Sequence, residues 1–128
     1  MSSDYPTLIN KKILIADDEE FIRHHIAKRL TSHGMEVIEA GSGEAVLEAM
    51  SQEPDIVLMD VKMPVLDGFE TTKRIRGIKR YNSIPIVLLS AKALKEDIEY
   101  GIKSGATDYL TKPVTFNQIM EKISELLS

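Results

Sequence analysis

Cysteine is missing from the 128-residue sequence, and so is any long apolar run. Without cysteine the chain has no disulfide bond and no thiolate metal site, which agrees with a cytoplasmic location. No apolar run approaches the roughly 18 residues of a membrane-spanning helix, so we expect no membrane partner. The first ten residues, MSSDYPTLIN, lack the basic start and apolar core of a secretory signal, and we expect residues 1–10 to form a short tail.

A positive charge excess is also lacking, because the formal net charge is −4. This balance argues against direct binding of nucleic acid by the chain. The length suits one ordinary domain, which would bury roughly two thirds of the surface that its unfolded form exposes. We therefore expect a single domain over residues 11–128.

Short apolar runs alternate with segments of helical spacing. The runs occupy residues 13–15, 36–38, 56–59 and 86–89, with a weaker fifth at 108–110. The first, third and fourth are expected to be buried on both faces of a sheet. Ile22, Ile26 and Leu30 recur at helical spacing, and apolar residues from Phe116 to Leu127 repeat the pattern.

Helix-terminating and helix-starting residues fall between these segments. Gly34 and Gly105 lie where helix C-termini are expected, and Asp67 and Thr115 where helices should begin. Five alternations of strand and helix predict right-handed crossovers, a parallel sheet and helices on both of its faces. The expected architecture is one layered α/β domain.

Polar side chains follow four of the expected strands. They are Asp17 and Asp18 after the first, Asp60 after the third, Ser90 and Ala91 after the fourth, and Thr111, Lys112 and Pro113 after the fifth. In an open parallel sheet, ligands bind beyond the carboxyl ends of the strands, near the point where the strand order reverses. If these strands are neighbours, the polar side chains converge on one site.

The run of four carboxylates after the first strand has a simpler explanation as a helix start. Asp17 or Asp18 could cap the first helix, with Glu20 completing a capping box begun by Asp17. One cap needs only one carboxylate, however, and the helix dipole presents only about half a unit charge. We therefore interpret Asp17 and Asp18 as part of a site shared with Asp60, and Glu19 and Glu20 as acids of the helix start.

The expected carboxylate cluster requires a positive partner. Carboxylates separated by about 4 Å repel by roughly 4 kcal/mol at an effective dielectric constant of about 20, which raises their pKa values or recruits a cation. Oxygen ligands alone favour a hard ion, and room for water suits Mg²⁺ better than Ca²⁺. Lys112 beside such a site indicates a further anion, for which phosphate is the natural candidate. Together with Ser90, these groups are the parts needed to form an acyl phosphate on Asp60.

Four motifs of the sequence resemble those of a known family. The segment DVKMPVLDG from Asp60 to Gly68, with Asp17-Asp18, Ser90-Ala91 and Lys112-Pro113, resembles the receiver domain of two-component response regulators, in the CheY-like superfamily. The four motifs are weak singly, but they occur in the right order after the right strands. The resemblance implies a five-stranded parallel sheet of order 2-1-3-4-5 with five helices. It also implies a phosphoryl group received from a histidine kinase or a histidine phosphotransfer protein.

The resemblance implies a role for each acidic residue. Asp60 would accept the phosphoryl group. Asp18, Asp60 and the main-chain carbonyl of Lys62 would bind Mg²⁺ directly, and Asp17 would act mostly through a metal-bound water.

It also implies roles around these acids. Lys112 would pair with the acceptor at rest and with a phosphoryl oxygen afterwards, and its bond to Pro113 would be cis. Ser90 would donate to the phosphoryl group, and Ala91 would leave its N–H accessible. Tyr109 would turn inward as Ser90 moves, so that the surface of the fourth helix, fifth strand and fifth helix becomes the output face.

Two lysines near the expected site have two possible roles, and two histidines are expected to have no role in the site. Lys62 and Lys92 either tune the phosphoryl lifetime or only soften an acidic pocket. His24 and His25 are adjacent on a helix and therefore point in different directions, so we interpret them as surface or packing residues rather than metal ligands.

Three other functions fit the sequence less well. A flavin carrier would place a Ser/Thr/Gly-rich phosphate loop after the first strand, where this chain has DDEE. An aspartate-nucleophile phosphatase expects a D-x-D arrangement there, and a degenerate receiver would have lost an acid or the lysine. We therefore expect a binding switch rather than an enzyme, with Mg²⁺-dependent self-phosphorylation and slow hydrolysis as its only chemistry.

The output of the expected switch is left open by the sequence. A stand-alone regulator that acts on a separate effector protein and a receiver joined to an output domain both fit. A monomer and a phosphorylation-dependent dimer are equally compatible with the sequence.

Overall fold

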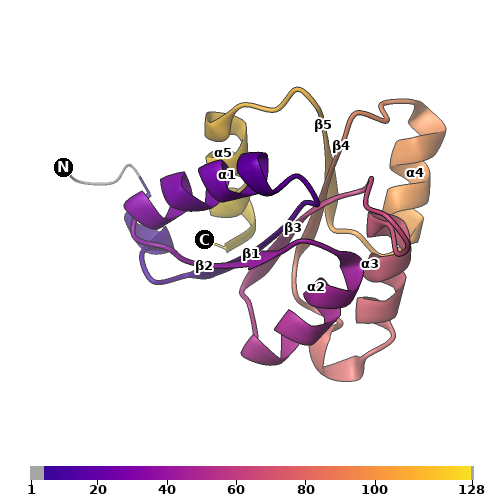
Figure 1. Ribbon diagram of the computed structural model, residues 1–128, viewed down its shortest axis with the longest axis horizontal. Coiled ribbons are helices and arrows are strands. Elements are labelled where there is room, and N and C mark those ends of the chain that lie inside the picture. The colour runs from indigo at the N-terminus through magenta and orange to yellow at the C-terminus, as the bar shows by residue number, and fades with distance from the viewer. Residues whose placement is uncertain (1–4, 128) are drawn as a thin grey trace.

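Five short parallel strands form the centre of the structure, a computed structural model that describes residues 5–127 (Figure 1). They are β1 (Lys12–Ala16), β2 (Glu36–Ala40), β3 (Ile56–Asp60), β4 (Ile86–Ser90) and β5 (Asp108–Thr111). The strand order is β2-β1-β3-β4-β5, and every neighbouring pair is parallel. The expected sheet order is therefore confirmed.

Burial follows the position of each strand in the sheet. All residues of β3 and β4 are buried, and so are the last four residues of β1. The edge strands β2 and β5 have mixed exposure. Central strands with both faces covered are therefore the ones whose sequences carry continuous apolar runs.

Helices cover both faces of the sheet (Figure 1). One layer contains α1 (Glu20–Ser32) and α5 (Phe116–Leu127), and the other contains α2 (Gly43–Ala49), α3 (Gly68–Arg76) and α4 (Lys95–Lys103). Short 3-10 turns lie at Pro6–Leu8, Met50–Gln52 and Lys79–Tyr81. The sheet thus separates two apolar cores, one beneath each helical layer.

The expected helix ends are confirmed at four positions. The Asp67 side chain accepts a hydrogen bond from the Glu70 N–H at 2.8 Å, and Thr115 and Gln118 form a reciprocal pair at the start of α5. Gly34 and Gly105 follow helices with φ values of 92° and 114°, which an L-residue rarely adopts.

The expected tail is described in part. Residues 1–4 lie outside the described residues. Within the rest, Leu8 is fully buried in the core beneath α1 and α5, and Tyr5 packs against the same core. The domain boundary at residue 11 stays a prediction.

Val65 occupies a strained position in the loop between β3 and α3. Its φ is 67°, and the Leu66 N–H donates to the Pro64 carbonyl oxygen at 2.8 Å, which closes a three-residue turn around Val65. A positive φ is unusual for a β-branched residue, and the side chain is 94% exposed, so packing does not compensate for the strain.

Relief of this strain gives a test of the loop geometry. Val65→Asn is expected to raise the free energy of unfolding by about 1 kcal/mol, because asparagine adopts a positive φ more readily than a β-branched residue does. Chemical denaturation measures the change. Val65→Ile is the matched control and should give no gain, because isoleucine is also β-branched. Equal stability of the asparagine variant and the native protein would contradict the loop geometry.

Candidate functional site

The expected site residues meet at one edge of the sheet. Asp60 and Ser90 are the last residues of β3 and β4, while Asp17 and Lys112 directly follow β1 and β5. Because all the strands are parallel, these four positions lie at the same carboxyl edge. The strand order reverses between β1 and β3, which is the place where ligands bind in such sheets.

Three carboxylates come together at this edge. Asp17, Asp18 and Asp60 each offer an oxygen atom, and these atoms all lie within 4.8 Å of one another. Asp17 and Asp60 are each only 7% exposed, whereas Asp18 is exposed. Main-chain donors orient the two buried groups: the Glu19 N–H donates to Asp17 at 2.9 Å and the Lys62 N–H to Asp60 at 3.3 Å.

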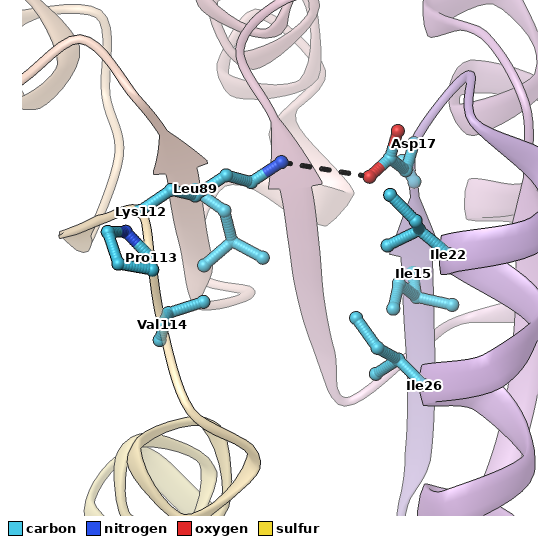
Figure 2. Close-up of a pocket in the computed structure, with 9 residues that line it drawn as sticks. Ile15, Asp17, Ile22, Ile26, Leu89, Lys112, Pro113 and Val114 are labelled. Atoms are coloured by element: carbon cyan, nitrogen blue, oxygen red, sulfur yellow. Dashed lines mark ion pairs between the residues drawn. The ribbon is translucent and has the colours of Figure 1, made fainter.

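Lys112 places an ammonium group against the cluster. Its Nζ lies 3.3 Å from Asp60 Oδ2 and 3.8 Å from Asp17 Oδ2, and the second contact is the dashed line in Figure 2. The Lys112–Pro113 bond is cis, as expected. One ammonium leaves two negative charges of the cluster unbalanced. The all-oxygen donor set therefore fits a hard divalent cation such as Mg²⁺.

Burial raises the pKa of the Asp17 carboxyl, and the nearby charge of Asp60 raises it further. The hydrogen bond from the Glu19 N–H and the Lys112 ammonium act in the opposite direction. The raised pKa means that the ionised carboxylate is less stable here than in water. A divalent cation at the cluster would relieve this instability.

The helix-capping explanation of Asp17 is wrong. The first residue of α1 is Glu20, and Glu19 precedes it as the N-cap residue without a side-chain cap hydrogen bond. Asp17 instead accepts from Glu19 within the loop before the helix. Glu20 does lie in the first turn, where the helix dipole favours an acid.

Ser90 and Tyr109 are linked through Lys92 and also interact directly through their side chains. Ser90 is 2% exposed, and its Oγ accepts from the Lys92 N–H at 3.0 Å. The Tyr109 hydroxyl donates to the Lys92 carbonyl oxygen at 2.8 Å. Tyr109 is 7% exposed, and burial raises the pKa of its hydroxyl. The aromatic ring therefore lies inward beneath the loop after β4, while Ala91 in that loop is exposed.

Gly101 is a functional candidate that sequence reasoning missed. A Cβ atom at Gly101 of α4 would lie 2.8 Å from Tyr109 Cδ2 and 3.2 Å from Leu88 Cδ1. The glycine therefore makes room for the inward tyrosine ring. Its position inside a helix was the available signal, because an interior glycine is costly and often has a packing reason.

An apolar cavity of about 230 Å³ lies beside the acidic cluster (Figure 2). Its lining comes from Ile15, Ala16, Ile22, Ile26, Leu89, Pro113 and Val114, with Asp17 and Lys112 at its polar end. Ile22 shares the helical spacing of Ile26 and Leu30, but it is 44% exposed. Its side chain faces this open cavity instead of the closed core.

Other side chains near the cluster behave largely as surface residues. Lys62 and Lys92 are exposed, and Lys92 Nζ lies 5.9 Å from the centroid of the Phe69 ring. His24 and His25 are exposed as expected, and His24 Nδ1 lies 2.9 Å from Glu39 Oε2. Within residues 5–127, no helix is both long and apolar enough to cross a membrane.

Comparison with known proteins gives consistent matches. Residues 13–124 match the family described as the response regulator receiver domain. Protein PilH of Pseudomonas aeruginosa is 35% identical over 118 residues, which cover 91% of this chain and 98% of PilH. The alkaline phosphatase synthesis transcriptional regulatory protein PhoP of Bacillus subtilis is 38% identical over 120 residues, which cover 93% of this chain and 49% of PhoP. The chain thus spans about half the length of this and several other transcriptional regulators that it matches.

Solved structures agree with the sequence matches. The chemotaxis protein CheY4 of Vibrio cholerae superposes with a TM-score of 0.86 at 32% identity, covering 92% of this chain and 99% of CheY4. The receiver domain of the Francisella response regulator 1452 gives a TM-score of 0.85 at 32% identity, with 92% and 97% covered.

The raised pKa of Asp17 predicts a specific dependence of stability on pH. The folded protein binds this proton more tightly than the unfolded chain, so ionisation of Asp17 destabilises the fold as the pH rises above the ordinary value of 3.8. In metal-free buffer at pH 7, Asp17→Asn is expected to raise the Tm by a few degrees. The gain should vanish below pH 3.8, where the native carboxyl is protonated in both states.

Thermal scans at several pH values measure this effect. Asp18→Asn is the matched control, since Asp18 is exposed and its neutralisation should change the Tm less. A Tm of Asp17→Asn at or below that of the native protein at pH 7 would contradict the account of the buried carboxylate.

Proposed function

The chain belongs to the response regulator receiver domain family, and we propose that it is a signalling switch activated by phosphorylation of Asp60. The observation that carries the proposal is the environment of the Asp60 carboxylate. One of its oxygens accepts from the Lys62 N–H, the other lies 3.3 Å from Lys112 Nζ, and both Asp17 and Asp18 are within reach of a shared cation.

The phosphoryl donor in this proposal is a phosphohistidine of a sensor histidine kinase or histidine phosphotransfer protein, the partner class of receiver domains. A carboxylate oxygen of Asp60 attacks phosphorus, and a new P–O bond forms as the P–N bond breaks. The electron pair of that bond stays on the imidazole nitrogen, which is then protonated. The product is an acyl phosphate on Asp60, and the released histidine is neutral.

The surrounding residues suit the charge that moves in this step. Mg²⁺ held by Asp17, Asp18, Asp60 and the Lys62 carbonyl would neutralise the oxygens of the transferred group. Lys112 exchanges its contact with Asp60 for one with a phosphoryl oxygen, and its compact charge suits that anion.

Ser90 and Ala91 complete the phosphoryl site in this proposal. The Ser90 Oγ accepts from the Lys92 N–H and interacts with the Tyr109 hydroxyl, and in this proposal its O–H turns to donate to the phosphoryl group. The small Ala91 side chain leaves the main chain open to approach.

The proposed switch connects this site to α4, β5 and α5. Lys92 donates to Ser90 through its N–H and accepts from Tyr109 through its carbonyl oxygen, so movement of Ser90 is transmitted to the tyrosine. Moving a two-state equilibrium from 1:99 to 99:1 takes about 5.5 kcal/mol. Two or three charge-assisted hydrogen bonds of roughly 1.5–3 kcal/mol each supply that energy.

For the output partner we propose a class of partner and not an individual protein. PilH and CheY4 are similar over nearly their whole length, whereas PhoP carries further sequence. A separate effector protein and a fused output domain are therefore both compatible with the proposal, as are a monomer and a phosphorylation-dependent dimer. We propose a cytoplasmic switch without enzymatic activity toward other molecules, whose receiver domain spans residues 11–128.

Phosphorylation by a small donor tests the acceptor. Incubation with acetyl phosphate and Mg²⁺ is expected to add the mass of one phosphoryl group to the native protein, and Asp60→Asn should remain unmodified. Asp67→Asn is the matched control, because Asp67 lies in the same loop but caps α3, and asparagine caps equally well. No adduct on the native protein, or an adduct on Asp60→Asn, would overturn the proposal.

A phosphoryl mimic tests the switch separately. Beryllofluoride with Mg²⁺ is expected to shift the NMR amide signals of residues 90–112 in the native protein. Tyr109→Phe lacks the hydroxyl that bonds to Lys92, so the shifts in α4 should be smaller while those next to Asp60 persist. Unchanged signals over residues 90–112 of the native protein would contradict the switch without affecting the assignment of the acceptor.

A further inference from the structure

A largely buried arginine side chain contacts the main chain of the acidic loop. Arg23, in the first turn of α1, exposes only 14% of its side chain. Its Nη1 donates to the main-chain carbonyl oxygen of Asp17 at 2.8 Å, and its Nε donates to Glu39 Oε1 at 3.0 Å. Burial of a charge is unfavourable unless the charge is paired and hydrogen-bonded, so these two contacts fix the position of the side chain.

The second contact of Arg23 is itself supported by neighbouring groups. Glu39 lies in β2, and its other carboxylate oxygen lies 2.9 Å from His24 Nδ1. Burial raises the pKa of Glu39, but the hydrogen bonds from His24 and Arg23 outweigh it and hold this pKa below its usual value. Glu39 therefore carries the charge that neutralises Arg23.

Gly41, just after β2, leaves the space that Arg23 occupies. A Cβ atom at Gly41 would lie 3.1 Å from Arg23 Nη1, closer than most such contacts. The guanidinium group thus fits between the end of β2 and the loop after β1.

The main chain of Asp17 is held on both sides. Its N–H donates to the Ala40 carbonyl oxygen at 3.1 Å, and its own carbonyl oxygen accepts from Arg23. That carbonyl belongs to the peptide group that joins Asp17 to Asp18. The direction of this peptide group determines how the two neighbouring carboxylates project from the loop.

We propose that Arg23 is a positioning residue for the acidic cluster, which orients Asp17 and Asp18 toward a shared divalent cation by binding the peptide group between them. The inference rests on the proposed function, in that the cation is Mg²⁺. Arginine suits this position because its planar fork donates to two acceptors at once, which the single ammonium of lysine does less well. Pairing with Glu39 keeps the guanidinium from repelling the cation.

Mg²⁺ binding to the unphosphorylated chain tests this role directly. The dissociation constant is measured by NMR titration of the amide signals around Asp60 in metal-free buffer. Arg23→Gln is expected to raise the constant on the order of 10-fold, as loss of groups that orient metal ligands typically does. Arg23→Lys restores one of the two contacts and should give an intermediate value.

Arg29→Gln is the matched control on the same helix. The Arg29 guanidinium lies 4.0 Å from the centroid of the Phe116 ring, so its loss removes a packed arginine without touching the acidic loop. This variant should keep the native Mg²⁺ affinity even if its Tm falls. If Arg23 had only a structural role, Arg23→Gln would lower the Tm. Its Mg²⁺ affinity would then stay at the native value, like that of Arg29→Gln.

Glu39→Gln supplies an independent measurement. It leaves Arg23 in place but removes the charge that neutralises it, so Mg²⁺ affinity should fall in the same direction. The double variant with Arg23→Gln should bind no more weakly than Arg23→Gln alone, because Glu39 affects the cation only through Arg23. Fully additive losses would show that the two residues act separately and would overturn the inference.

The outcomes distinguish this inference from the proposed function. Failure of the native protein to bind Mg²⁺ would overturn the metal site itself. Native binding together with an Arg23→Gln dissociation constant within about two-fold of the native value would overturn only the role of Arg23, because lost orienting groups usually change metal affinity by about 10-fold or more.

Discussion

Repulsion between neighbouring carboxylates is the constraint on which the rest of this structure depends. Three acidic side chains share a small volume at the edge of the sheet, two of them are buried, and one lysine faces them. Folding alone would favour fewer charges at this point. A bound divalent cation would offset the negative charge of the carboxylates. Together with Lys112, it would also offset the negative charge of a phosphoryl group on Asp60.

The sheet topology explains why these charges meet. Strand order reverses between β1 and β3, so the loops after these neighbouring strands diverge to opposite faces and leave a crevice between them. Asp17 and Asp60 stand on the two sides of that crevice, and Lys112 reaches it from β5. Apolar cores on both faces of the sheet keep the strands in place, so a rigid scaffold carries a carboxylate cluster that destabilises the fold when no divalent cation is bound.

The sequence was sufficient for the parts of the structure that depend on local pattern. Buried strands, helix caps and the residues that directly follow each strand could be predicted, because strand ends in a parallel sheet share one edge. Contacts between distant elements away from that edge could not. Arg23 and Glu39 are 16 positions apart, and neither helix spacing nor strand alternation indicates that they meet. The same holds for Gly101 and Tyr109, and for Ile22, whose exposure depends on a cavity that only the assembled structure contains.

The link from Ser90 through Lys92 to Tyr109 uses only main-chain atoms of Lys92, beside a direct contact between the Ser90 and Tyr109 side chains. Nineteen of the twenty amino acids possess that N–H and that carbonyl, and only proline lacks the donor. The connection is therefore nearly independent of which side chain stands at position 92. The exposed Lys92 side chain can therefore vary without breaking this connection, so the main-chain link and the chemistry of the surface above it are separable at a single residue.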